Sequence, residues 1–195
     1  MQLQKFGVKL FLNTNKNYES KDFIPVFHSW IQNKAVEDHL LIDVADYSHI
    51  QDGPGVMLVA HEGNFSLDQE SLQPGIMYMR KTKIKGDFIQ RFNNVLTTTI
   101  ETANRLCKNN IIKDVHFKNN SFRFIANDRL FAEHTTENQD LYKKKIQKAI
   151  DGRYPGSQFE FEDFSDEKER LAFTVTFTSD INITNQEKER LEEKR

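Results

Sequence analysis

Residues 40–68 read LLIDVADYSHIQDGPGVMLVAHEGNFSLD and contain two near-continuous apolar runs, at 40–45 and 56–62. Runs of this kind are typical of central strands that are buried on both faces. The Asp-Gly-Pro-Gly sequence at 52–55 predicts a turn between them, because glycine and proline interrupt regular structure. A second tight turn is expected at 62–64, where Glu-Gly-Asn precedes another short strand.

The sequence on either side of this stretch predicts alternating strands and helices. Residues 5–12 alternate as a strand, and Asp22 is a plausible N-cap for a helix that carries Pro25 in its first turn. Asn119-Asn120 suits a hairpin turn between two short strands. From residue 76 onward the expected order is strand, helix, strand, strand, helix, strand, at 76–81, 87–108, 115–117, 122–126, 138–150 and 158–164.

This order is that of a split βαβ, ferredoxin-like unit. The sequence therefore predicts an α+β fold with a mixed, mainly antiparallel sheet, built from a ferredoxin-like βαββαβ core with N-terminal strand and helix additions. We expect a single domain over residues 4–178. Residues 179–195 have little apolar content and predict a charged tail, flexible or partly helical.

Composition narrows the classes of partner and compartment. The net charge of -2 provides no overall attraction to a phosphate backbone, so a nucleic-acid partner is not expected. A single cysteine excludes an intramolecular disulfide framework. No stretch approaches the roughly 18 apolar residues of a spanning helix, and the N-terminus lacks the pattern of a secretion signal. The expected setting is the cytoplasm, without a membrane partner.

Three residues in the central stretch form a candidate proton-transfer site. Asp43 shares a strand face with apolar neighbours, where an acid needs a hydrogen bond or a charged partner. Asp46 and His49 follow in the next loop, and a carboxylate beside an imidazole can orient it for acid–base catalysis. The alternative is that both aspartates only accept hydrogen bonds from turn amides.

Other residues of the same stretch are candidate ligand-binding groups, namely Tyr47, Asp52, His61 and Glu62. The His-Glu pair lacks the second histidine of a zinc-protease motif, since Phe65 stands in its place. His49 and His61 are expected at opposite ends of a hairpin, too far apart for one metal ion. The sequence therefore predicts no metal site.

A second group of candidate binding residues is cationic. Arg80 lies at the carboxyl end of one predicted strand, and Asn127, Asp128 and Arg129 lie at the end of another. In a ferredoxin-like arrangement these strands are parallel neighbours, so both groups would reach the same edge of the sheet. Two arginines there would hold a carboxylate or phosphate. The alternative is that Arg129 pairs with nearby acids at the surface.

Three segments, FIPVFHSWIQ (23–32), the stretch 40–68 and NDRL (127–130), resemble a family of small bacterial proteins with no assigned activity. The resemblance covers residues 5–178 and implies a bacterial cytoplasmic protein, with no cofactor or catalytic residue to carry over. No phosphate-binding loop, dinucleotide motif or nucleophile elbow is present in the sequence.

Two functions are therefore compatible with the sequence. The first is an accessory binding domain for a small anionic ligand or a protein partner, without a cofactor, and a homodimer is compatible with it. The second is a small acid–base enzyme, hydrolase-like, that uses an Asp/His pair near residues 43–49.

Overall fold

The computed structural model describes residues 3–13, 18–51, 53–163 and 170–184. In this part of the chain one eight-stranded sheet dominates, and every pair of neighbouring strands is antiparallel. Across the sheet the strands are β2 (Leu41–Tyr47), β3 (Gly55–Ala60), β4 (Gly63–Asp68), β5 (Gly75–Arg80), β1 (Phe6–Leu12), β6 (Phe117–Ala126), β8 (Ala172–Phe177) and β7 (Phe159–Asp163).

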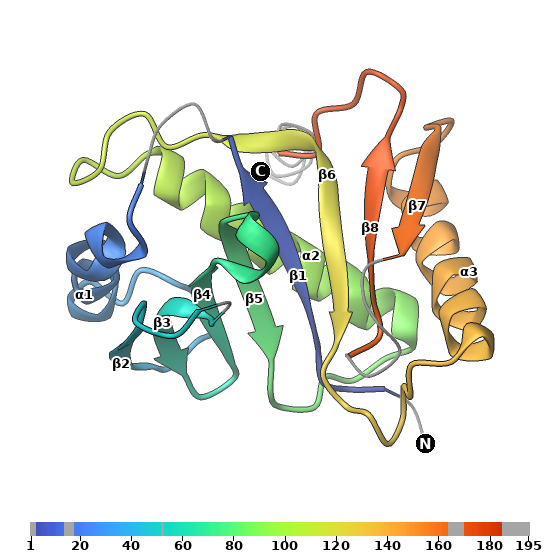
Figure 1. Cartoon of the computed structure of the whole chain (residues 1–195), viewed down its shortest axis with the longest axis horizontal. Coiled ribbons are helices and arrows are strands. Elements are labelled where there is room, and N and C mark those ends of the chain that lie inside the picture. The colour runs from blue at the N-terminus through green and yellow to red at the C-terminus, as the bar shows by residue number, and fades with distance from the viewer. Residues whose placement is uncertain (1–2, 14–17, 52, 164–169, 185–195) are drawn as a thin grey trace.

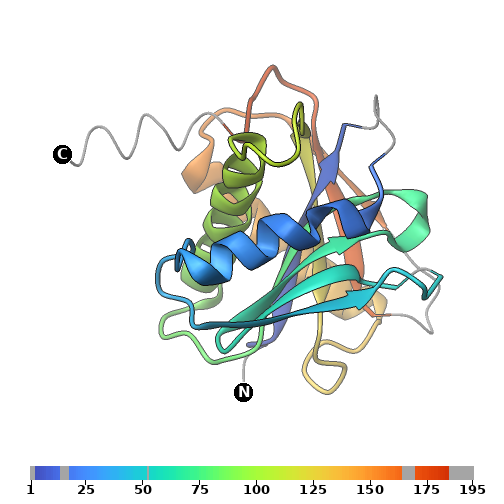
Figure 2. The ribbon, with the colours of Figure 1, turned by 90° about the vertical axis from the view of Figure 1, so that its left-hand side faces the viewer.

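The helices cover one face of this sheet, as the side view shows (Figure 2). They are α1 (Ile24–Gln32), which follows the short helix η1 (Ser20–Phe23), α2 (Phe88–Cys107) and α3 (Thr136–Arg153). Helix α2 packs on β1 and β5, α3 packs beside α2, and α1 packs on β2. The short helix η2 (Glu70–Leu72) lies on the opposite face, in front of the sheet in Figure 1.

Local sequence explains where the long helices begin. The Asp87 carboxylate accepts a hydrogen bond from the Gln90 amide (2.8 Å), and the Gln90 side chain accepts one from the Asp87 amide (2.9 Å). This reciprocal capping box satisfies amides that the first turn leaves without partners. In α3 the Thr135 hydroxyl accepts a hydrogen bond from the Asn138 amide (3.3 Å).

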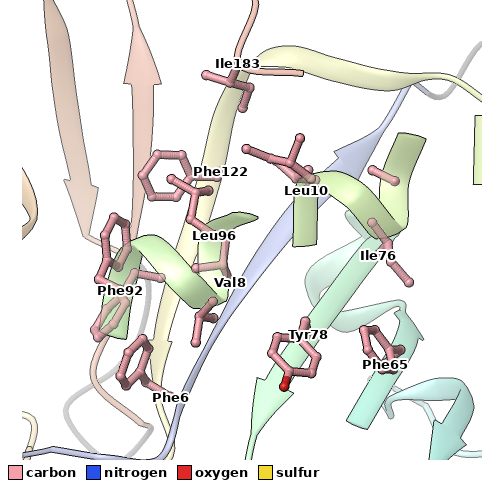
Figure 3. Packing of buried hydrophobic residues seen from close by; sticks show 14 of the residues in the cluster. Phe6, Val8, Leu10, Phe65, Ile76, Tyr78, Phe92, Leu96, Phe122 and Ile183 are labelled. Carbon is pink, nitrogen blue, oxygen red and sulfur yellow. The ribbon is translucent and has the colours of Figure 1, made fainter. Parts of the chain in front are cut away.

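The core lies between the helices and the sheet and is rich in phenylalanine rings, which pack among a larger number of aliphatic side chains (Figure 3). Phe6, Val8 and Leu10 of β1 face α2 because alternate residues of a strand point to the same side. Ile183 also belongs to this core, with 1% of its surface exposed. Residues 179–184, which the sequence analysis assigns to the tail, therefore contribute to the packed domain.

The predicted ferredoxin-like core is wrong. The sequence analysis divides residues 115–126 into two strands at Asn119-Asn120, but β6 runs without interruption from Phe117 to Ala126. With one strand in place of two, the βαββαβ order cannot form. In addition, β1 lies between β5 and β6 instead of extending a separate core, and the sheet is antiparallel throughout the described residues.

The Gly-Pro-Gly turn has a structural requirement at Gly55. Its φ of 62° is in the left-handed region that favours glycine. A Cβ atom at this position would lie 2.1 Å from the Leu67 carbonyl oxygen. The turn therefore depends on glycine for the close approach of two backbone segments.

The face of the sheet opposite the helices contains buried charges. Lys9 is opposite Met77 on β5 and Arg123 on β6, so the three side chains lie in one row across the sheet. The Lys9 side chain is fully buried and forms a salt bridge with the Asp68 carboxylate. Arg123 donates to the Thr174 hydroxyl (3.2 Å) and to the Gln73 side chain (2.7 Å).

The two edge strands differ from the central strands in their polarity. Strand β2 has a register shift between Leu41 and Asp43, which interrupts its pairing with β3. Strand β7 carries Glu160, Glu162 and Asp163. Strand β2 also carries Asp43 and Asp46, so both edges of the sheet are acidic, and the β2 edge is also irregular.

Candidate functional site

The two aspartates proposed for catalysis hydrogen-bond to nearby backbone amides. Asp43 Oδ1 accepts from the Val44 amide and Asp46 Oδ1 accepts from the Ser48 amide, both at 2.8 Å. Hydrogen bonds from the Ser48 side chain and backbone lower the pKa of Asp46 below its ordinary value. His49 is exposed, and within residues 18–51 and 53–163 it forms no hydrogen bond with either carboxylate.

The other proposed residues of this loop do not complete a site. Tyr47 ends β2 with 38% of its surface exposed. Asp52 lies outside the described residues. The loop is therefore an exposed turn in which the aspartates stabilise the backbone.

At the other end of β3, Glu62 connects three segments of chain. Its carboxylate accepts a hydrogen bond from the Leu40 amide (2.8 Å), and its carbonyl oxygen accepts from the Lys81 amide (2.9 Å). Burial opposes ionisation of Glu62, but the hydrogen bond from the Leu40 amide brings its pKa below the ordinary value, with smaller contributions from the neighbouring His39 and His61. His61 itself is exposed beside this junction.

Next to Glu62, a directed chain of hydrogen bonds links Arg80, Tyr78 and His39. His39 Nδ1 lies 2.8 Å from the Glu37 carbonyl oxygen, an arrangement that requires Nδ1 to carry the proton. In a neutral ring Nε2 is then the acceptor, and the Tyr78 hydroxyl, 2.7 Å away, donates to it. Arg80 Nη1 in turn donates to the Tyr78 oxygen (3.1 Å).

Aromatic packing fixes the position of Tyr78. Its ring stacks on Phe65 with the ring centroids 4.7 Å apart, and His39 contacts both rings edge-on. Tyr78 is fully buried. Its hydroxyl group lies at the end of the apolar cluster in Figure 3. Burial raises the pKa of Tyr78, so the phenol remains protonated at neutral pH.

Arg80 is the positively charged residue that this series of hydrogen bonds orients. It is half-buried, and its Nε donates to the Thr82 carbonyl oxygen (3.2 Å) in addition to the bond with Tyr78. A guanidinium has five N–H donors. Among the residues that the structure describes, no carboxylate lies within ion-pair distance of Arg80. The group is oriented and charged, with donors left for an external anion.

The residues after Arg80 add positive charge at the same place. Lys81, Lys83 and Lys85 follow in the loop to α2, and residues 80–85 contain no acid. This loop lies at the lower edge of the sheet in Figure 1. We call residues 80–85 the basic loop.

The proposed partnership of Arg80 with residues 127–129 needs correction. Strand β1 lies between β5 and β6, so the strands that carry the two groups are not neighbours. They do run in the same direction, since both are antiparallel to β1, and both end at the same edge. Asn127 accepts a hydrogen bond from Arg170 (3.4 Å), the Asp128 carbonyl accepts from the Ala132 amide (2.9 Å), and Arg129 is exposed.

Neither His39 nor Tyr78 was predicted from the sequence as a site residue. One signal was present in the sequence: Tyr78 and Arg80 are two residues apart on a strand, so they share a face. His39 has no such signal, because its position depends on the turn that precedes β2. Only the folded chain brings it to the Tyr78 hydroxyl.

Comparisons with known proteins add no family to this description. No model of a known protein family matches the chain, and no curated protein does so. Across the described residues, no helix is long and apolar enough to cross a membrane. The same residues contain no group of three or more His, Cys, Asp or Glu side chains arranged to hold a metal ion.

Proposed function

We propose that this chain is an accessory binding domain that recognises a small anionic ligand through Arg80. The observation that carries the proposal is the half-buried guanidinium, which Tyr78 and Thr82 orient and which has no carboxylate partner among the described residues. Oriented arginines bind carboxylates and phosphates with paired N–H donors.

The basic loop supports the same assignment. Four cations in six residues attract an anion to this edge, although the whole chain has a net charge of -2. The carboxylate of Glu62 lies near the His39 side of the chain, where its charge acts on His39 and His61. The ligand class that fits best is a compact carboxylate or phosphate compound that reaches Arg80 from the side of the basic loop.

Binding is a better-supported function than acid–base catalysis near residues 43–49. Asp43 and Asp46 each hydrogen-bond to a backbone amide, and His49 is exposed. A catalytic pair needs a carboxylate within hydrogen-bond reach of the imidazole. We also propose a bacterial cytoplasmic setting, which the single cysteine and the resemblance of residues 5–178 support.

Calorimetric titration with inorganic phosphate, pyrophosphate and citrate tests the proposal. Thermal denaturation gives a second measurement. An anion present at 100 times its dissociation constant should add about 2.7 kcal/mol to the free energy of unfolding, which raises Tm by several degrees. Arg80→Gln should weaken binding at least about tenfold, because a charge-assisted pair is lost.

Two arginine variants act as controls for this titration. Arg105→Gln removes an exposed arginine of α2 and should leave the affinity unchanged. Arg129→Gln tests whether the neighbouring loop contributes to the same site. Equal affinity of Arg80→Gln and Arg105→Gln for every anion would reject the proposal and direct attention to a protein partner.

A further inference from the structure

A hollow lined by asparagines lies at the end of the molecule opposite the basic loop, where β1 ends and β6 begins. Its volume is about 380 Å³, within the range of small-molecule sites. The end of β1, the last turns of α2, the start of β6 and residues 182–184 all contribute to its wall. In Figure 1 this region is at the top of the sheet.

The lining of the hollow is amide-rich and carries no carboxylate among the described residues. His116 and Lys118 also line it, but most of its polar side chains are amides or hydroxyls, namely Asn13, Asn104, Asn119, Asn120, Asn182 and Thr184. Each amide presents an N–H donor and a carbonyl acceptor side by side. A sugar hydroxyl is also both a donor and an acceptor, so adjacent hydroxyls of a sugar ring match such a surface.

Backbone hydrogen bonds build the rim before any ligand is present. The Asn13 amide donates to the His116 carbonyl oxygen, and the Ile183 amide donates to the Asn119 carbonyl oxygen, both at 2.8 Å. The buried side chain of Ile183 anchors its segment in the core. Asn182 and Thr184 on either side of it are thereby held at the hollow.

Two of the amides are also fixed as side chains. Asn182 Oδ1 accepts hydrogen bonds from the Thr184 amide (3.0 Å) and hydroxyl (2.6 Å). Asn104 Nδ2 donates to the Thr184 carbonyl oxygen (3.3 Å). In the described part of the chain, the side chains of Asn13, Asn119 and Asn120 make no hydrogen bond, so their amides face solvent ready for a ligand.

We propose that the asparagine hollow binds a neutral monosaccharide. The half-buried Phe117 lines the same hollow and offers an apolar surface for the carbon side of a sugar ring. Hydrolysis of a glycosidic bond ordinarily requires a pair of carboxyl groups, and the described lining has none. The proposed role of the hollow is to bind the sugar, and this site is separate from the anion site at Arg80.

Cys107 provides a direct measurement, because it lines the hollow and is the single cysteine of the chain. Burial raises the pKa of its thiol, so alkylation by iodoacetamide is slow enough to follow at fixed pH. The probes are glucose, galactose, mannose and N-acetylglucosamine. At least one of them should protect Cys107 from alkylation in a saturable manner, with a matching dissociation constant by calorimetry.

Matched asparagine variants locate the binding. Asn120→Ala should weaken the affinity about three- to tenfold, the effect of one or two lost hydrogen bonds. Asn94→Ala, at an exposed position of α2 outside the hollow, should leave it unchanged, and so should Arg80→Gln. Asn13→Ala gives the same test if Asn120→Ala fails to fold.

The proposal is overturned if none of the four sugars protects Cys107 or gives heat on titration. It is also overturned if a sugar binds with equal affinity to the Asn120→Ala, Asn13→Ala and Asn94→Ala variants. Loss of sugar binding in Arg80→Gln would place the sugar at the anion site instead, whereas failure of anion binding alone leaves this proposal unaffected.

Discussion

The two faces of the sheet differ in the charge that they bury: the helix side is largely apolar, whereas the other face combines a small apolar cluster with buried charged groups. On the helix side, Phe124 lies within ring-contact distance of five aromatic side chains: Phe6, Phe88, Phe92, Tyr142 and Phe173. On the other side, Lys9 is equally buried but contacts the carboxylate of Asp68 and the ring of Phe11. The same strand β1 therefore contributes to an apolar layer and to a buried ion pair.

The difference shows that burial alone does not determine how well a position tolerates substitution. An aromatic layer is stabilised by area and packing, which neighbouring rings share. A buried ion pair depends on both partners, because removal of one leaves a desolvated charge. A Cβ atom at Gly75 would lie 2.3 Å from the Leu10 carbonyl oxygen and 3.0 Å from Lys9 Cε, so this glycine leaves room for the β1 backbone and for the Lys9 side chain.

The largest loss of stability is expected on the helix side. Phe124→Ala should lower the free energy of unfolding by about 3–5 kcal/mol, because it leaves a cavity among five rings. Urea denaturation measures this change. Phe161→Ala, at a half-buried position on the edge strand β7, should lose distinctly less; an equal loss would contradict the ranking.

Lys9 tests the other face. Lys9→Met should lower the free energy of unfolding by about 3 kcal/mol, since the Asp68 carboxylate remains buried without its cation. In the double variant Lys9→Met with Asp68→Leu, most of that stability should return, because both charges are gone. If the loss of stability in the double variant equals the sum of the losses in the two single variants, Lys9 and Asp68 are not energetically coupled.

Glu70, on this face of the sheet, is expected to make the stability of the fold depend on pH. Burial and the nearby Asp68 raise its pKa above the ordinary value of 4.5, although Arg170 and Lys9 act in the opposite direction. A group with a raised pKa in the folded state stabilises the fold while it is protonated and loses that contribution as the pH rises.

Urea denaturation between about pH 4 and about pH 7 checks the sign. The stability of the native chain relative to Glu70→Gln should fall as the pH rises through this range. A rise over the same range would show instead that the charged form of Glu70 is favoured by its neighbours.

Tyr78→Phe should have the smallest effect on stability, about 1 kcal/mol, the usual contribution of a hydrogen bond. The change separates Arg80 from His39 without altering the ring packing, so anion binding should weaken less than in Arg80→Gln. Tyr47→Phe, at an exposed hydroxyl, is the matched control and should change neither quantity. An unchanged anion affinity in Tyr78→Phe would show that Thr82 alone is sufficient to orient Arg80.

Local periodicity predicted most of the individual elements, but not how they assemble. The capped apolar stripe of α2 and the alternation in β7 are short-range patterns, and the structure has these elements within a few residues of the expected positions. The error arose at Asn119-Asn120, where turn-forming residues occupy the exposed first half of a long strand. Asn119 and Asn120 lie within the register shift of the β1–β6 pairing, between Phe122 opposite Leu10 and Phe117 opposite Leu12. Their turn preference therefore produces a local irregularity and does not divide the strand.

The candidate site was only partly accessible to sequence reasoning for a similar reason. Arg80 was selected from its place at the end of a strand, and Glu62 from its place beside a turn. The link from Arg80 through Tyr78 to His39 depends on contacts between segments 39 residues apart. Neither spacing nor composition encodes such a contact, whereas the hydrogen bonds of Asp43 and Asp46 are local and were foreseen as an alternative.

The acidic edges of the sheet have a consequence for self-assembly. An open antiparallel sheet presents backbone groups on which another strand can be added without limit. Here the Asp43 carboxylate already accepts a hydrogen bond from the Val44 amide on β2, and the register shift distorts the same edge. The far edge carries Glu160, Glu162 and Asp163, so copies that approach edge to edge bring like charges together. This repulsion opposes fibre growth.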